Sequence, residues 1–518
     1  MDKKINENLV IICKDGSYKL NKEACTDICK AKYEVYQSSR QEKFASTMNN
    51  GKIVTLDIQS EAFKSNVRNF IRKESGLNNV DNATLKGIID CLKDKAVETE
   101  EKVLHSRTYY DAENNEVYID QCDNRNAIKI DTNSIDVIQC PIGIFQEYPT
   151  DLPMVVHKKA TAADVPNYIS KLTRLTGDNL MILSLFLVAC LFGNDKPIPL
   201  LYITGPQGAS KSTLSRLIQR IVDPCKNGLL SLSDSKKDIA IAVSKRRLCV
   251  FDNSGGLKHK KSISDLMCSV ITKGSMQTRT LYTTKDETII DYRSVVVING
   301  IDWLSDQVDL LQRSIMLELP TISEEERKTE EELEAETNEV LPYLLGGIYD
   351  AIQNILRSDD ITVTGLPRMA DYAKLTAKAC EAMGYDVTAY QAALKNNYAS
   401  ILNGFSEGDI TMKAVKLFMS KRQSYVKSMS ELYNGCYSVI SGQVLPGEMG
   451  DFPKGSAAFS RRINTLKDPL ALVGITFTTR KTNEYTEITI TNANSGNQYT
   501  TTISHPLVKK KGITRKTI

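Results

Sequence analysis

The sequence has few of the residues and spacings that build metal centres. It contains four histidines, and none of its twelve cysteines forms a Cys-x-x-Cys pair, so the ligand pattern of common zinc sites is absent. Most cysteines lie in apolar segments, as Cys190 does in LVAC and Cys249 in RLCVFDN. This placement favours reduced, buried thiols in a cytoplasmic protein over disulfides or metal ligands.

Net charge and long apolar runs are also lacking. The 66 basic and 63 acidic residues leave a net charge of +3. Such a balance neither indicates nor excludes a nucleic-acid partner, so any DNA contact has to come from local patches. The longest apolar run, LMILSLFLVACLF at residues 180–192, is too short to span a bilayer. We expect it to form a buried helix.

The first 150 residues predict two modules. Residues 1–102 are expected to be a mostly helical region, because DNATLKGIIDCLKDKAV carries apolar residues on one helical face behind a capping Asn82. Residues 103–150 predict a small β-meander, since about four short strands are separated by the turn-forming segments AENN, DNRN and DTNS.

The rest of the chain predicts an α/β core, a helical lid and a smaller terminal domain. Within residues 160–325, the segments PLLYITG, GLLSLS, RLCVFDN, SVVVING and SIMLELP show little alternation, which is typical of parallel strands covered by helices on both faces. Residues 326–405 predict the lid. In residues 406–502 three helices precede a hairpin, the pattern of a winged-helix domain, and residues 503–518 are a basic tail.

The stretch GPQGASKS, residues 205–212, is similar to a phosphate-binding loop. Gly205, Lys211 and Ser212 match the usual pattern, and Ser210 stands where the pattern has glycine, which implies a modest strain. A loop between a buried strand and a helix points backbone N–H groups at an anion. Lys211 would reach the outer phosphates of ATP, and Ser212 would hold Mg²⁺. The loop residues expected to bind ATP are Gly205, Pro206, Gln207, Gly208, Ala209, Ser210, Lys211, Ser212 and Thr213.

Polar residues end or follow the next strands. Asp252, at the end of RLCVFDN, is expected to hold Mg²⁺ with Ser212. Asn253 stands beside it, where phosphate-loop ATPases often carry a catalytic glutamate. Because an amide orients water but accepts no proton, hydrolysis is either slow or uses a base elsewhere. Asn299 would orient the attacking water. Arg313 suits an arginine finger supplied across a subunit interface, with an ordinary surface salt bridge as the alternative.

Five strands with these features in this order resemble the core of ring-forming AAA+ ATPases. Between Asp252 and Asn299, RTLYT and TIIDY around TKDE predict a hairpin, which resembles the pore hairpin of superfamily-three helicases of viruses and plasmids. The resemblance implies that this hairpin grips DNA, with Lys285 at its tip; a plain surface hairpin is the alternative. Arg368 in LPRMADYA begins a lid helix, where it would sense the γ-phosphate of its own subunit or serve as a cap or interface residue.

A wider resemblance covers roughly residues 100–400. The β-meander, the segments DNSGGL and TRTLYTT, and LPRMADYA together look like the primase-associated ATPases of phages, plasmids and integrative elements. This resemblance implies ATP and Mg²⁺ as cofactors, DNA as a partner, assembly with itself into a hexameric or similar ring, and a separate primase or replication protein as a further partner. Residues 1–100 carry no primase carboxylate cluster or zinc ribbon, so priming activity does not carry over.

The predicted winged helix supplies candidate DNA contacts. Arg461 and Arg462 are adjacent in GSAAFSRRINTL and therefore point about 100° apart, so we expect one of them to face phosphate. Arg480 and Lys481 lie on the wing TTRKTNEY. Two basic elements beside a groove fit phosphate contacts, although winged helices also dock proteins.

Three functions compete on these grounds. The first is an ATP-dependent, ring-forming DNA helicase or translocase of a mobile genetic element. The second is an ATP-switched DNA-binding initiator, regulator or defence protein with weak or no hydrolysis, which Asn253 and Ser210 favour. The third, a metabolic kinase, has no use for a winged helix and fits least.

Overall fold

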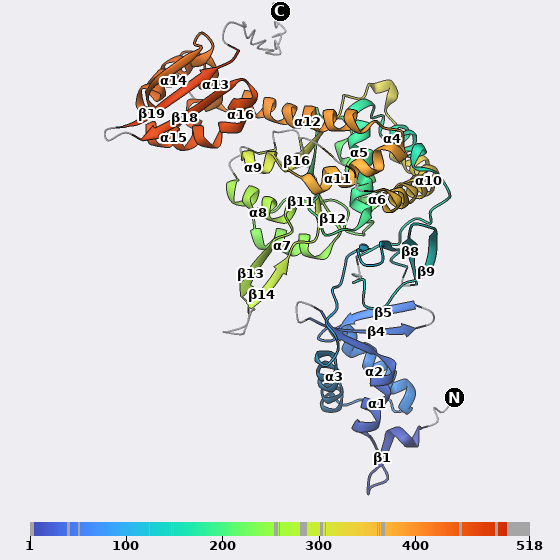
Figure 1. Ribbon diagram of the computed structural model, residues 1–518. Coiled ribbons are helices and arrows are strands. Elements are labelled where there is room, and N and C mark those ends of the chain that lie inside the picture. Colours follow the sequence, from blue (N-terminus) through green and yellow to red (C-terminus); the bar gives the residue numbers. More distant parts are fainter. Residues whose placement is uncertain are drawn as a thin grey trace, which may run out of the picture. The chain divides into compact units, whose positions relative to one another are not determined.

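The chain divides into two compact units, Met1–Ile401 and Leu402–Ile518, in the computed structural model drawn in Figure 1. The structure describes residues 5–494 except for 39–41, 50–51, 124, 147, 149, 253–256, 258–259, 280–286, 301–303, 306, 360, 362, 364–367, 445–447 and 482–484. All twelve cysteines are free and nine of them are buried. The expectation that most thiols are buried is therefore confirmed.

The N-terminal region mixes helices with short antiparallel strands, so the prediction of a mostly helical region was incomplete. Its helices are η1 (Glu7–Leu9), α1 (Lys22–Lys32), α2 (Glu61–Ser75) and α3 (Asn82–Val97). Its strands are β1 (Val10–Ile12), β2 (Tyr18–Leu20), β3 (Glu34–Gln37), β4 (Lys43–Asn49) and β5 (Lys52–Asp57). The cap of α3 is Asp81, whose side chain accepts a hydrogen bond from the Thr84 N–H at 2.8 Å, and not Asn82 as predicted.

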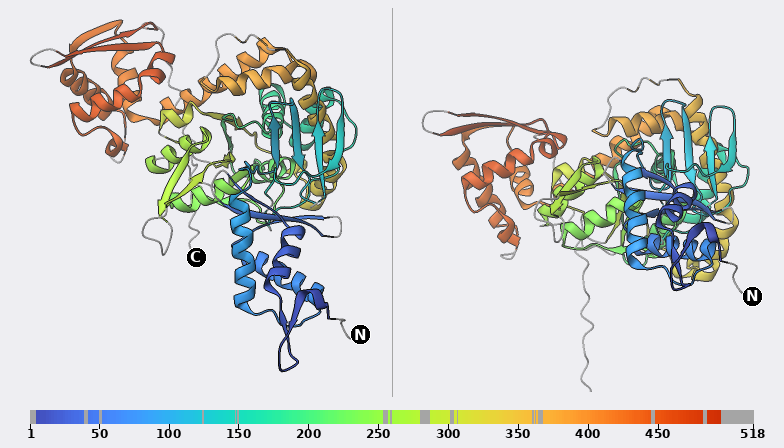
Figure 2. Two further views of the ribbon diagram at one scale, coloured as in Figure 1. Left: turned by 60° about the horizontal axis from the view of Figure 1, so that its bottom comes forward. Right: turned by 90° about the horizontal axis from the view of Figure 1, so that it is seen from below.

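The predicted β-meander is confirmed. Strands β6 (Thr108–Asp111), β7 (Glu116–Asp120), β8 (Asn126–Ile130) and β9 (Ile135–Gln139) form one antiparallel sheet in chain order. Side-chain amides tie this sheet to helix α10 (Glu330–Arg357), because Gln353 donates to the Asp131 carbonyl at 2.8 Å and Asn115 donates to the Leu356 carbonyl at 3.1 Å. The sheet and α10 lie side by side in both views of Figure 2.

The five segments predicted as parallel strands form one parallel sheet. They are β10 (Leu200–Thr204), β11 (Leu230–Ser231), β12 (Leu248–Asp252), β15 (Val295–Asn299) and β16 (Ser314–Glu318), in the order β11-β12-β15-β10-β16. Their apolar residues are buried except Leu230 and Met316, which are half-buried, as expected of strands covered on both faces. Because β10 lies between β15 and β16, the loop that follows β10 opens where the strand order changes direction, the usual ligand position in such sheets.

Helices cover this sheet and build the region that was predicted as the lid. Those of the core are η2 (Ala162–Asp164), α4 (Val165–Thr173), α5 (Gly177–Phe192), α6 (Lys211–Val222), α7 (Lys236–Lys245), α8 (Lys261–Ile271) and α9 (Val308–Leu311). After η3 (Glu324–Glu326) and α10 come α11 (Ala370–Cys380), η4 (Glu381–Met383) and α12 (Val387–Gly408).

Helix α5 contains the longest apolar run and is fully buried from Met181 to Phe192, which confirms the expectation of a buried helix. Among the described residues no single helix has the length and apolar character to cross a membrane. Within the same residues, one pair of helical segments, Ala162–Thr173 and Gly177–Phe192, has this length and apolar character when the two are taken together, but the pair is bent by 113°.

The hairpin between β12 and β15 is present, with its first strand earlier in the chain than predicted. Strands β13 (Ser275–Arg279) and β14 (Glu287–Asp291) pair antiparallel, with Ser275 opposite Asp291. A left-handed turn at Lys273 (φ 56°) ends α8 and leads directly into β13, so the strand starts at Ser275 and not at Arg279. Lys285 lies outside the described residues.

The second unit contains the three predicted helices and the predicted hairpin, with one additional strand. Its elements are α13 (Ile410–Met419), β17 (Ser424–Ser428), α14 (Met429–Ser441), η5 (Glu448–Asp451), α15 (Ser456–Thr465), α16 (Lys467–Leu472), β18 (Ile475–Lys481) and β19 (Thr486–Asn492). The strands form one antiparallel sheet in the order β17-β19-β18. Phe459 of α15 is fully buried, so this helix packs one face on the unit and leaves the other exposed.

Candidate functional site

The loop GPQGASKS joins β10 to α6 at the carboxyl edge of the parallel sheet. Gly205 and Gly208 both have positive φ, 149° and 84°, values that glycine adopts readily. A Cβ atom on Gly205 would lie 2.6 Å from the Leu319 carbonyl oxygen. The first glycine is therefore required for the loop to pass close to the chain that leaves β16.

Ser210 has the backbone conformation that the missing glycine would supply. Its φ and ψ are 57° and 31°, in the left-handed region, and it is the N-cap of α6 without a capping hydrogen bond from its side chain. For a residue with a Cβ this conformation costs about 1–2 kcal/mol. The loop keeps the shape of a phosphate cradle, and its N–H groups at the start of α6 have no earlier turn to bond to.

Lys211 and Ser212 are the first residues of α6 and meet Asp252 at the end of β12. The Ser212 hydroxyl donates to the Asp252 carboxylate at 2.8 Å. The Lys211 ammonium donates to the carbonyls of Gly205 and Pro206, both at 2.8 Å. Burial lowers the pKa of Lys211, and the Asp252 carboxylate partly offsets this effect. Residues that are 40 positions apart thus place a hydroxyl and a carboxylate at one point, a donor set of the kind that suits Mg²⁺.

Asn299 ends β15 beside Ile203 of β10, but its side chain is turned into the protein. Its amide donates to the Ser215 hydroxyl at 2.7 Å, and the residue is 1% exposed. In this arrangement Asn299 supports α6 one turn behind Ser212. The predicted role of orienting water stays a prediction. Asn253, the residue after Asp252, lies outside the described residues.

Arg313 and Arg368 come together on one carboxylate, away from the loop of their own chain. Asp309 of α9 pairs with Arg313 at 2.7 Å and with Arg368 at 2.6 Å. Arg313 directly precedes β16, at the amino edge of the sheet, where the Leu200 N–H donates to its carbonyl. Lys211 lies at the carboxyl edge, so neither arginine is brought to the phosphate loop of this chain.

The basic residues of the second unit differ in exposure. Arg461, Arg480 and Lys481 are exposed. The Arg462 guanidinium, by contrast, pairs with Asp409, whose side chain is 9% exposed, and lies over the Phe405 ring. Arg462 is therefore held by its own unit, and Arg461 is the arginine of α15 that faces outward.

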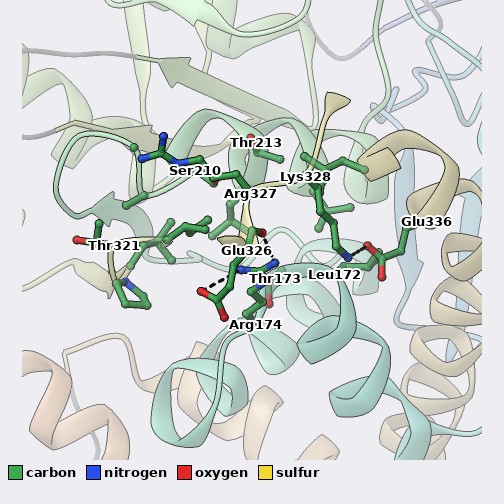
Figure 3. Close-up of a pocket in the computed structure, with 18 of the residues that line it drawn as sticks. Leu172, Thr173, Arg174, Ser210, Thr213, Thr321, Glu326, Arg327, Lys328 and Glu336 are labelled. Carbon is green, nitrogen blue, oxygen red and sulfur yellow. Dashed lines mark hydrogen bonds and ion pairs between the residues drawn. The ribbon is translucent and has the colours of Figure 1, made fainter. Parts of the chain in front are cut away.

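A cavity of about 590 Å³ beside the loop was not predicted from the sequence. Figure 3 shows its lining, which comes from the end of α4, the start of α6, the chain after β16 and the start of α10. The apolar part of the lining is Leu172, Leu214, Leu217, Leu319, Ile322 and Leu333. Two ion pairs cross it, Arg174 with Glu326 at 3.5 Å and Lys328 with Glu336 at 2.6 Å. The cleft beside the loop therefore combines apolar side chains with charged ones, a mixture that ligand pockets often have.

This cavity had only a weak signal in the sequence. The segment SEEERKTEEELEAETN, residues 323–338, reads as a solvated charge run. Most of the segment is exposed, as expected of a solvated charge run, but Glu326, Lys328 and Glu336 also line the pocket. There Glu326 pairs with Arg174, which follows α4, and Lys328 pairs with Glu336.

Comparisons with known proteins connect the core with DNA replication. Residues 168–399 match the model of a family described as actinomycete integrative conjugative element replication protein. The match starts in α4 and ends in α12, so it covers the parallel sheet, the phosphate loop and most of the lid, which is less than half of the chain. No curated protein matches the sequence.

Among solved structures, two apo structures of the NrS-1 C-terminal region are similar. One has 13% identity and a TM-score of 0.42, the other 12% identity and a TM-score of 0.40. In both cases the likeness covers 90% of this chain and 97% of the other.

Proposed function

We propose that this protein is an ATP-dependent, ring-forming DNA helicase or translocase that serves the replication of a mobile genetic element. The observation that carries the proposal is the meeting of Lys211, Ser212 and Asp252 at the carboxyl edge of the parallel sheet. The similarity of residues 168–399 to a replication protein of integrative conjugative elements supports the biological setting.

Magnesium and ATP fit the residues of the loop. Bound Mg²⁺ neutralises charge on the outer phosphates of ATP. Ser212 and Asp252 would hold the metal, since their oxygens lie 2.8 Å apart. Lys211, whose ammonium bonds two loop carbonyls, would exchange these bonds for phosphate oxygens. The apolar lining of the neighbouring cavity would take the base and exclude water from it.

Hydrolysis would be completed by a second subunit. Arg313 lies at the edge of the sheet opposite Lys211, so it has no route to the phosphate loop of its own chain. Arg313 would instead reach a neighbour's loop and stabilise charge on the transferred phosphoryl group. Asp309 would hold its guanidinium in position and, because it also binds Arg368, would place a second cation beside it.

The DNA contacts of this motor would come from two places. One is the hairpin β13–β14, between whose strands Lys285 lies in the sequence. The other is the second unit, in which Arg461 on α15 and Arg480 and Lys481 on the β18–β19 hairpin are exposed. Helices α13, α14, α15 and α16 with a three-stranded antiparallel sheet support the winged-helix interpretation and hence phosphate contacts by these cations.

One feature favours a second candidate, an ATP-switched assembly or DNA-binding protein with negligible turnover. The residue after Asp252 is Asn253, which cannot take a proton from water. ATP would then act by holding subunits together, and the release of DNA would follow nucleotide exchange and not hydrolysis.

An ATPase assay with and without single-stranded DNA distinguishes the two candidates. The motor requires hydrolysis that DNA stimulates and that Lys211→Ala removes. Ring assembly with ATP but no measurable phosphate release would favour the switch. A protein that stays monomeric with ATP and DNA would contradict both.

A mixing experiment tests the shared site. Arg313→Ala subunits added to wild-type protein should lower activity by more than their share of the mixture, because each would spoil a neighbour's site. Arg220→Ala, a change at a half-buried residue of α6 that removes a hydrogen bond to Asn338, is the matched control and should dilute activity in proportion. Proportional dilution by Arg313→Ala would refute the shared site.

A further inference from the structure

A second polar pocket lies at the opposite edge of the parallel sheet from the phosphate loop. Its volume is about 240 Å³. Asp195, Arg247 and Arg293, which line it, come shortly before β10, β12 and β15, whereas Lys211 and Asp252 lie where these strands end. A strand of five residues is about 16 Å long, so the two pockets are separate sites.

Cations outnumber anions around this pocket. Arg247, Lys273 and Arg293 line it together with Asp195 and Asp291. His105 also lines the pocket, but burial together with Arg293 and Arg247 lowers its pKa to about 4, although Asp195 opposes this shift. The imidazole is therefore neutral at physiological pH, and the charge of the pocket comes from the other groups.

Two donors in the lining are buried and have no hydrogen-bond partner for the atom concerned. Arg247 is 5% exposed and Thr108 is 3% exposed. The Nη2 atom of Arg247 and the hydroxyl of Thr108 make no hydrogen bond with any described residue. The rest of Arg247 is fixed, since its Nε donates to the Cys190 carbonyl at 2.8 Å. Leaving such donors unsatisfied costs about 1–3 kcal/mol each, so a ligand that accepts from both would be favoured.

The third cation, Lys273, is also held in place. Its ammonium donates to the carbonyls of Arg293 and Ser294, at 2.6 and 3.2 Å. Burial and the neighbouring Arg247 lower the pKa of Lys273 to about 7. A bound anion would offset both the burial of Lys273 and the repulsion from Arg247, because its negative charge would stabilise the protonated ammonium.

The pocket is also the place from which the hairpin leaves the core. Lys273 precedes β13, and Asp291, Tyr292 and Arg293 end or follow β14. Thr108 and His105, which also line the pocket, belong to the segment that enters the β-meander. A ligand here would contact both the hairpin base and the start of the meander.

We propose that this pocket binds a phosphate group through Arg247, Lys273 and Thr108. Phosphate is the fitting chemistry because a tetrahedral oxyanion accepts several hydrogen bonds from donors on different sides. The phosphate belongs either to the backbone of single-stranded DNA that follows the hairpin or to a free phosphate compound. This site does not depend on nucleotide binding at the other edge of the sheet.

Two titrations in the full-length Lys211→Ala protein test the proposal and separate the sources. The substitution removes the phosphate-binding lysine of the other site. Inorganic phosphate is titrated by calorimetry, and a labelled oligo-thymidylate of about 20 nucleotides is titrated by fluorescence anisotropy over a range of salt concentrations. If substitutions in the pocket weaken the binding of inorganic phosphate, the ligand is a free phosphate compound. If they weaken only the binding of DNA, the ligand is a phosphate of the DNA backbone.

Thr108→Val is the decisive variant. It replaces an unsatisfied hydroxyl by a methyl group, so the empty protein should be as stable as before or more stable. It should weaken ligand binding about tenfold or more, the usual effect of losing a hydrogen bond to a charged group. Lys273→Gln should weaken binding and should reduce by about one the magnitude of the slope of the logarithm of DNA affinity against the logarithm of salt concentration.

Two further variants complete the test. Asp195→Asn removes a competing carboxylate and should strengthen binding several-fold. Lys196 is a neighbouring exposed lysine outside the pocket lining, so Lys196→Gln is the charge-matched control for Lys273→Gln. This control should leave the binding of inorganic phosphate unchanged, and it should lower the salt dependence of DNA binding by less than Lys273→Gln does. The proposal is overturned if neither ligand responds to Thr108→Val and Lys273→Gln, or if Lys196→Gln has the same effect as Lys273→Gln.

Discussion

The left-handed conformation of Ser210 leads to a quantitative prediction about three substitutions. Serine pays about 1–2 kcal/mol for this backbone, and glycine would not. Glycine loses about 0.4–1 kcal/mol more entropy on folding, so Ser210→Gly should raise the free energy of unfolding by roughly 0.5–1 kcal/mol. Because the Ser210 side chain makes no capping bond, Ser210→Ala should change it by less than about 0.5 kcal/mol.

Ser210→Val completes the series. A β-branched residue in the left-handed region is a genuine outlier, so this variant should be the least stable, by about 1–3 kcal/mol. The three variants share position and exposure, and they differ mainly in how well each residue tolerates φ 57°. Their order of stability, glycine above alanine and serine above valine, is the result that the backbone geometry requires.

Chemical unfolding measures this order directly. Far-UV circular dichroism follows the unfolding, because the helices that cover the parallel sheet, α6 among them, contribute to the signal. Destabilisation by glycine, or a loss with alanine equal to the loss with valine, would show that Ser210 stabilises the loop through its hydroxyl and would refute the strain argument.

Three other predictions follow from single contacts. Gly205→Ala should abolish the stabilisation by ATP that thermal unfolding measures, because the new Cβ would lie 2.6 Å from the Leu319 carbonyl oxygen and displace the loop. If ATP still stabilised the variant, the close approach of loop and chain would be contradicted. Asp223→Ala should lower the free energy of unfolding by about 3–5 kcal/mol, since it leaves the buried Arg107 without the carboxylate that now lies 3.0 Å away. A loss below about 1 kcal/mol, the value of a surface ion pair, would argue against a buried ion pair. In phosphate-free buffer, the free energy of unfolding should rise from pH 7 to pH 9, because Lys273 titrates near pH 7 when folded and near 10.4 when unfolded. A Lys273→Met variant should lose this rise, and an identical pH profile in both proteins would refute the assignment.

The parts of the fold that were predicted correctly are those that local patterns determine. The β-meander and the five parallel strands stand out because turn residues separate the former and unbroken apolar runs mark the latter. The strands of residues 1–60 were missed, because β4 and β5 mix polar and apolar residues. The misplaced start of β13 has another cause, since the turn before it puts Lys273 in the left-handed region (φ 56°), a conformation uncommon for lysine.

The phosphate loop is the part of the site that the sequence by itself determined. Gly205, Gly208, Lys211 and Ser212 are close in the chain, and a strand before them and a helix after them leave few shapes for the segment. The pairing of Ser212 with Asp252 was also predictable, because parallel strands bring their carboxyl ends to one edge of the sheet.

Only the tertiary structure decided which distant side chains share a partner. It set Arg313 and Arg368 on Asp309, turned Asn299 toward Ser215, and paired Arg462 with Asp409. It also gathered Thr108, Arg247 and Lys273 around the second pocket. The physical reason is that such contacts depend on how helices and sheets pack against one another. The shape of a loop motif depends instead on residues that are close together in the sequence.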